Sequence, residues 1–136
     1  MLKCDKLSIT IAGRTLVREL SLELGSGEVI CMLGPNGVGK TLALHTLAGL
    51  LTPASGVVML DGEDISELGR RQIARRLGLL LQDDAESFPA TVLDTVLMGR
   101  HPYMTALGSA SAADHALADQ ALAAMEDLSA TKLPPG

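Results

Sequence analysis

The stretch of sequence that decides the fold is the glycine-rich run Gly34-Pro35-Asn36-Gly37-Val38-Gly39-Lys40-Thr41. It fits the phosphate-binding pattern G-x-x-x-x-G-K-[ST], in which glycines let backbone N–H groups turn toward phosphate oxygens. The apolar run 29–33 precedes it, and a helix-like stretch at 41–50 follows it. A strand, a glycine loop and a helix in that order are typical of nucleoside triphosphate binding. We therefore predict a triphosphate site on this loop.

The loop residues have separate chemical roles. A helix that begins near Gly39 would add its unpaired N-terminal N–H groups and the positive end of its dipole. Lys40 can place its ammonium on the outer phosphates, and Thr41 can place its hydroxyl on Mg²⁺. The candidate triphosphate-binding residues are therefore Gly34, Pro35, Asn36, Gly37, Val38, Gly39, Lys40 and Thr41, with Thr41 also a candidate metal ligand.

Composition narrows the class of protein. The chain has 136 residues, which suits one domain, and 47% of them are hydrophobic. A net charge of −5 without a basic, aromatic-rich stripe argues against a nucleic-acid partner. We see no signal-peptide segment and no apolar run of membrane-spanning length, so we expect a cytoplasmic chain. Cys31, inside the apolar run 29–33, is expected to be a small core residue.

Hydrophobic periodicity and turn residues predict the elements. Strands are expected at 2–11, 15–24, 29–33, 57–60 and 77–81. Helices are expected at 41–50, 66–76, 91–98 and from 111 to about 128. Ser66 is the expected N-cap of the second helix, and Thr91–Asp94 and Ser111–Asp114 are the expected capping pairs of the last two. Apolar residues fall at helical spacing in the last helix, at Leu117, Ala121, Ala124 and Leu128.

Several segments together resemble a known family. The run 27–30 leading into the glycine loop resembles the nucleotide-binding subunit of an ATP-binding cassette (ABC) transporter. So do the segment 56–65 and the stretch 77–81 that ends in Gln82 and is followed by Phe88-Pro89 and Thr91-Val92. The resemblance implies an α/β fold, a P-loop NTPase core with an N-terminal antiparallel β subdomain and the start of a helical subdomain. We place the partial core at 1–84 and the partial helical subdomain, truncated before the signature motif, at 85–136.

The resemblance also implies roles and partners. Gln82 matches the family's Q-loop glutamine, which helps to hold Mg²⁺ and senses the γ-phosphate of ATP. The segment 92–103 is similar to the branch that imports iron–siderophore, haem or cobalamin. The implied partners are a second ATP-binding subunit in a head-to-tail dimer and membrane permease subunits that contact the region after Gln82. The chain would then lie on the inner face of the cell membrane, held there by the permease.

The family's hydrolytic parts are not found in this sequence. The Leu-Ser-Gly-Gly signature, the Walker B aspartate with its glutamate, and the switch histidine all belong beyond the helix that ends near Leu128. Ile11 matches the position of the family's adenine-stacking aromatic residue, where an aliphatic side chain offers no π-face. We expect weak ATP binding and negligible hydrolysis by this chain alone.

A consequence for folding follows from the same resemblance. The strand that leads into the phosphate loop pairs, in the family, with strands from the part not found here. We therefore expect exposed sheet edges, uncovered apolar surface and a poorly soluble or partly disordered product.

Two other functions stay open. A small free-standing P-loop kinase or NTPase would use Asp61 or Asp83 for Mg²⁺, since Val57-Val58-Met59-Leu60-Asp61 has the form of a Walker B strand. Asp61-Gly62 is also a strong turn pair, and we favour the turn. The third possibility is a non-catalytic, truncated nucleotide-binding fragment.

Overall fold

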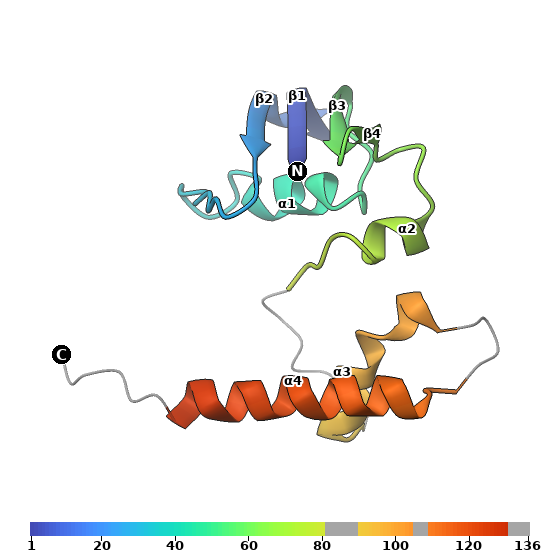
Figure 1. Cartoon of the computed structure of the whole chain (residues 1–136). Coiled ribbons are helices and arrows are strands. Elements are labelled where there is room, and N and C mark those ends of the chain that lie inside the picture. The colour runs from blue at the N-terminus through green and yellow to red at the C-terminus, as the bar shows by residue number, and fades with distance from the viewer. Residues whose placement is uncertain (81–89, 105–108, 131–136) are drawn as a thin grey trace. The chain divides into compact units, whose positions relative to one another are not determined.

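The computed structural model describes residues 1–80, 90–104 and 109–130, with side chains described as far as residue 126. The chain divides into two compact units, Met1–Leu79 and Leu80–Gly136, and each is described by itself (Figure 1). The first unit contains β1 (Leu2–Ile11), β2 (Arg14–Leu24), α1 (Lys40–Leu47), β3 (Ser55–Leu60), β4 (Glu63–Asp64) and α2 (Arg70–Ala74). The second contains α3 (Val92–Met98), a 3-10 turn (His101–Tyr103) and α4 (Ala112–Ala130). The predicted boundary at 84/85 lies outside the described residues.

The first unit is an antiparallel sheet with a helix against one face. The strand order is β2-β1-β3-β4, and each neighbouring pair is antiparallel. Helix α1 runs beneath β1 and β3 (Figure 1). The strands predicted at 2–11 and 15–24 are confirmed, and the predicted strand at 57–60 begins two residues earlier, at Ser55. The short strand β4 was not predicted.

A bulge in β1 sets which side chains face the core. Strict alternation would put Cys4, Lys6 and Ser8 on one face, but the register shifts between Cys4 and Leu7 and again before Ile9. Lys6 takes a positive φ of 47°, and its N–H donates to the Ser21 hydroxyl at 2.9 Å. The extra residue turns Leu7 and Ile9 onto the same buried face as Cys4.

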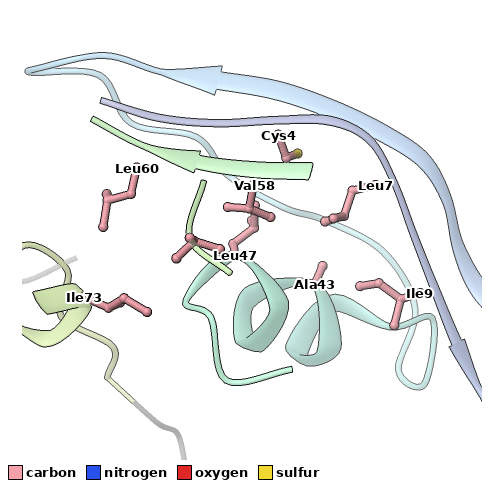
Figure 2. Close-up of a cluster of buried hydrophobic side chains, with 9 residues drawn as sticks. Cys4, Leu7, Ile9, Ala43, Leu47, Val58, Leu60 and Ile73 are labelled. Carbon is pink, nitrogen blue, oxygen red and sulfur yellow. The ribbon is translucent and has the colours of Figure 1, made fainter. Parts of the chain in front are cut away.

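The core of this unit lies between the sheet and α1. Figure 2 shows Leu7, Ile9 and Val58 from the sheet pointing toward Ala43 and Leu47 of α1. All five side chains are at most 6% exposed. Burial of each large aliphatic side chain contributes roughly 1.5–3 kcal/mol, so this contact holds the eight-residue helix, which is too short to be stable alone.

Two predicted strands are not formed. Residues 29–33 have no regular secondary structure and pair with no described strand. Residues 77–80 likewise lie in no ladder, and residue 81 is outside the described part. Val29 is 93% exposed and Leu33 is 86% exposed. Cys31, expected in the core, is exposed. Met32 is half-buried against the core, whereas Val29, Ile30 and Leu33 leave apolar surface exposed, as we expected.

Helix α2 is shorter than predicted. It spans Arg70–Ala74 rather than 66–76, and its N-cap is Gly69. The prediction of Ser66 as N-cap was wrong because the Ser66 N–H and hydroxyl both donate to Asp64, at 2.9 and 2.7 Å. Those bonds form a turn directly after β4 instead of starting a helix.

The helical unit confirms both predicted capping pairs. The Thr91 hydroxyl accepts from the Asp94 N–H at 3.1 Å, and the Ser111 hydroxyl accepts from the Asp114 N–H at 3.2 Å. The predicted apolar stripe of α4 was wrong by one position, because Ala118 is 2% exposed whereas Leu117 is 45% exposed. Ala118 lies one turn after the half-buried Asp114, so the two residues share the less exposed face of α4.

Gly56 is the tightest backbone position in the sheet. Its φ is +85°, and a Cβ there would lie 2.6 Å from the Asp5 carbonyl oxygen and collide with the Lys6 carbonyl. We expect Gly56→Ala to lower the free energy of unfolding of this unit by about 2 kcal/mol or more. Gly62 is the matched control, since it has the same φ of +85° but open space around it. Gly62→Ala should cost about 1 kcal/mol in urea denaturation. Equal effects of the two substitutions would contradict the proposed steric conflict.

Asp114 should titrate far below an ordinary aspartate. The hydrogen bond from the Ser111 hydroxyl (2.6 Å), and then the one from the Arg100 guanidinium (2.9 Å), lower the pKa of Asp114 from 3.8 to about 2. Because this folded-state pKa is depressed, the stabilisation is present above pH 3.8 and is lost as the pH falls through about 2. A carboxyl-carbon NMR titration checks this. Ser111→Ala should raise the pKa of Asp114, and a wild-type value near 3.8 would contradict the geometry.

Candidate nucleotide-binding site

The predicted phosphate loop connects the unpaired segment 29–33 to α1. Gly37 and Gly39 take φ values of +80° and +105°, in the left-handed region that favours glycine. Gly39 is the N-cap of α1, so the loop turns directly into the helix start. The C-terminal end of the glycine loop therefore leads into a helix, as the sequence pattern predicts.

The N-terminus of α1 is open to an anion. Gly39 supplies no side-chain cap, and the first helical hydrogen bond runs from the Ala43 N–H to the Gly39 carbonyl at 2.8 Å. The first-turn N–H groups that precede Ala43 therefore have no acceptor within the helix. No acidic residue lies in the first turn. Those donors and the positive end of the helix dipole suit a phosphate group.

Lys40 folds back over the loop. Its ammonium donates to the carbonyl oxygens of Gly34 and Pro35, at 2.7 and 2.8 Å. These two bonds hold a full positive charge at the first two residues of the loop, whose other end leads into α1. A phosphate oxygen entering the loop would find the ammonium and the backbone donors on the same stretch of eight residues. This geometry fits a polyphosphate.

Two strand residues support the loop from behind. A Cβ at Gly39 would lie 3.2 Å from the Val17 side chain and 3.4 Å from the Leu16 Cβ. Residues 16 and 17 therefore limit how far the N-terminus of α1 approaches β2, and they make glycine the fitting residue at position 39. Sequence analysis missed this role, because Val17 is one apolar residue among several in a strand and carries no separate signal.

Of the other predicted site residues, the structure describes Thr41 and Ile11 but not Gln82. Thr41 lies exposed in the first turn of α1, where its hydroxyl can reach a ligand bound at the loop. Ile11 ends β1, pairs with Arg14 and is 45% exposed, so its side chain is available at the surface. Gln82, the predicted second magnesium ligand, and Asp83 lie outside the described residues.

Asp61 has a structural role. It lies in the turn between β3 and β4 with φ of 53°, as its Asp-Gly pair predicts. Its carboxylate accepts from the Met1 ammonium at 2.7 Å, and this hydrogen bond and the charge of the ammonium lower the pKa of Asp61. Its N–H donates to the Met1 carbonyl at 2.8 Å. Across the described ranges there is no group of three or more His, Cys, Asp or Glu residues able to hold a metal ion.

The glycine loop, the uncapped helix and the adjoining sheet define an α/β nucleotide-binding domain of the P-loop NTPase class. The sequence profile of the family described as "ABC transporter" matches residues 17–135. The chain therefore belongs to the ABC transporter family. This confirms the predicted fold class and the family resemblance.

Curated relatives include proteins named for import. The hemin import ATP-binding protein HmuV of Rhizobium meliloti is 36% identical over 126 residues, which cover 93% of this chain and 47% of the relative. The ferric enterobactin transport ATP-binding protein FepC of Escherichia coli is 38% identical, with 75% and 38% covered. The cobalamin import ATP-binding protein BtuD of Halobacterium salinarum is 35% identical, with 86% and 29% covered. The chain thus spans between about a third and a half of the length of these relatives.

Solved structures agree on the fold. The structure of an inward-facing ABC transporter superposes with a TM-score of 0.73 at 25% identity, covering 92% of this chain and 44% of that one. The ATP-binding cassette MJ0796, a dimer bound to ADP and Pi, superposes with a TM-score of 0.72 at 20% identity, covering 93% and 56%. Within the described ranges, no helix is both long enough and apolar enough to cross a bilayer.

Proposed function

We propose that this chain forms the ATP-binding part of an energy-coupling subunit of an ABC importer for iron–siderophore, haem or cobalamin. The observation that carries the proposal is the Lys40 ammonium, held over a glycine loop beside the uncapped N-terminus of α1. The names of the relatives support the substrate class, since hemin, ferric enterobactin and cobalamin proteins all match over most of this chain.

The loop residues would bind ATP by exchanging partners. Lys40 would turn its ammonium from the Gly34 and Pro35 carbonyls, 2.7 and 2.8 Å away, toward the β- and γ-phosphates. The backbone N–H groups at the start of α1 would take phosphate oxygens without large rearrangement, because α1 is held by its packing on the sheet. In this arrangement the glycine loop and the start of α1 supply the groups that bind the phosphates.

A magnesium ion would bind beside the phosphates at the same loop. Thr41 and Gln82 would hold it through hydroxyl and amide oxygens, ligand types that Mg²⁺ accepts. The ion would supply charge neutralisation on the phosphates. Ile11 would give the adenine an aliphatic contact in place of aromatic stacking.

The partners proposed are a second ATP-binding subunit and a membrane permease. The dimeric form of the superposed MJ0796 cassette supports a dimer, and the family resemblance implies its head-to-tail arrangement. Permease contact through the region after Gln82 is supported by apolar side chains exposed on the helical unit, at Val92, Met98, Leu117 and Met125. The permease would hold the subunit at the inner face of the membrane, and no nucleic acid is involved.

The geometry of the site bears on the two alternative functions, a free-standing kinase and a non-catalytic fragment. A free-standing kinase that uses Asp61 for Mg²⁺ loses support, because the Asp61 carboxylate already accepts a hydrogen bond from the Met1 ammonium at 2.7 Å. A non-catalytic nucleotide-binding fragment stays open, since the chain spans at most about half of the relatives described above.

Lys40→Ala should weaken binding of fluorescent mant-ATP in the presence of Mg²⁺ by about tenfold or more. The reason is the loss of charge-assisted hydrogen bonds to phosphate, each of which contributes about 1.5–3 kcal/mol. Lys3→Ala is the matched control, because Lys3 pairs with Glu23 at 3.2 Å on the sheet and should leave binding unchanged. An unchanged affinity of Lys40→Ala for mant-ATP would refute the proposed role of Lys40 in binding the phosphates.

Hydrolysis by the isolated chain should be negligible. The first turn of α1 holds no acidic residue that could act as a base for water at the loop, and phosphoryl transfer depends on such positioning. A steady-state phosphate-release assay at saturating MgATP checks this expectation. Turnover that Lys40→Ala abolishes would show that this chain carries catalytic parts of its own.

A further inference from the structure

A hydroxyl-lined pocket lies on the antiparallel sheet, on the face away from α1. Leu7 and Ile9 of β1 point toward α1 (Figure 2), so Ser8 between them faces the other side of the sheet. The volume of the pocket is about 510 Å³, within the range of small-molecule sites. Its lining consists mainly of Ser8, Thr10, Thr15, Arg18, Glu19 and Ser55.

A bulge brings two consecutive charged residues to this pocket. The register of β1 and β2 shifts here, so that Ser8 lies opposite two residues of β2, Arg18 and Glu19. Consecutive residues of a regular strand point to opposite faces, whereas a bulge re-aims one of them. Glu19 has a φ of 46°, and both Arg18 and Glu19 line the pocket. The guanidinium and the carboxylate therefore belong to the same site.

The pocket has more hydroxyl hydrogens than its own acceptors use. The Ser8 hydroxyl accepts from the Glu19 N–H at 3.1 Å, so its own hydrogen is left to donate to another group. The Thr10 and Thr15 hydroxyls bond to each other at 3.1 Å, which uses only one of their two hydrogens. Within the described residues the Ser55 hydroxyl has no acceptor. A ligand of this pocket is therefore expected to be rich in acceptor oxygens.

The guanidinium of Arg18 gives the pocket a preference for an anion. Among the residues that the structure describes, Arg18 makes no ion pair, although Glu19 follows it in the chain. A guanidinium suits a phosphate group, because it donates two parallel hydrogen bonds to the phosphate oxygens. The residues that line the pocket include no aromatic ring on which a neutral sugar could stack.

The carboxylate of Glu19 restricts which anion fits. A carboxylate accepts hydrogen bonds and repels a second negative group, so it favours a ligand that carries hydroxyl groups beside its phosphate. We propose that this pocket binds a small phosphate ester bearing hydroxyl groups, such as a sugar phosphate. Arg18 and the serine and threonine hydroxyls hold the phosphate, and Glu19 accepts from the hydroxyl groups of the ester. The proposal goes beyond nucleotide binding, since no residue of the glycine loop lines the pocket.

The experiment follows the amide shifts of the ¹⁵N-labelled 136-residue chain during titration with glucose 6-phosphate, inorganic phosphate and glucose. We expect saturable shifts at Ser8, Arg18 and Ser55 with glucose 6-phosphate, and about tenfold weaker binding of inorganic phosphate, which lacks the hydroxyl groups that Glu19 accepts. Glucose should leave these amides unchanged. No saturable shift with glucose 6-phosphate, or equal affinities for any two of the three probes, would overturn the proposal.

Two variants of β2 separate the pocket from general attraction to positive charge. Arg18→Gln should weaken the binding of glucose 6-phosphate by at least about tenfold, since charge-assisted hydrogen bonds are lost. Arg14→Gln is the matched control, because Arg14 is exposed on the same strand and does not line the pocket. Unchanged amide shifts of Leu7 and Ile9 in the unliganded variants check the fold. Equal losses of affinity in both variants would overturn the proposal.

The phosphate groups of these probes can also occupy the glycine loop, so each place has its own variant. Lys40→Ala should remove shifts in the glycine loop and keep those in the hydroxyl-lined pocket. Arg18→Gln should do the reverse. Pocket shifts that disappear in Lys40→Ala would overturn this inference alone, whereas pocket shifts without any shift of the wild-type loop would contradict the proposed nucleotide site alone.

Discussion

The packing of α1 on the antiparallel sheet is the constraint on which the site depends. An eight-residue helix does not persist alone in water, so its start is fixed only because Ala43, Thr46 and Leu47 are buried beneath β1 and β3. That burial aims the uncapped helix N-terminus at the glycine loop. The loop can then bind an anion with donors that are already in place, which is cheaper in free energy than ordering them on binding.

The same loop is held unequally on its two sides. Its C-terminal side joins an anchored helix, and beside Val17 it leaves little room for a side chain at position 39. Its N-terminal side continues an apolar segment that pairs with no described strand. The relatives HmuV and BtuD described above are about two to three times as long as this chain. Apolar residues 29–33 are suited to the middle of a sheet, yet no described strand pairs with them.

Local signals were sufficient for much of the fold. Alternation predicted β1 and β2, the glycine pattern predicted the loop and α1, and Thr91 and Ser111 marked the starts of the last helices. Signals failed where the outcome depends on distant residues. The apolar run 29–33 predicts a strand, but a strand forms only where a neighbouring strand pairs with it, and no described strand does. Ser66 reads as an N-cap, but Asp64 takes its hydrogen bonds. The closeness of Val17 to position 39 depends on how β2 lies against the start of α1, which no local sequence signal predicts.

The central claim is that phosphate binds between the glycine loop and the start of α1. A titration of the ¹⁵N-labelled chain with MgATP, followed by amide chemical shifts, tests it most directly. The account predicts the largest shifts at Gly37, Gly39, Lys40 and Thr41, with small changes elsewhere in the sheet. Shifts centred instead on the hydroxyl-lined pocket at Ser8 and neighbouring strand residues, or no shifts at all, would contradict it.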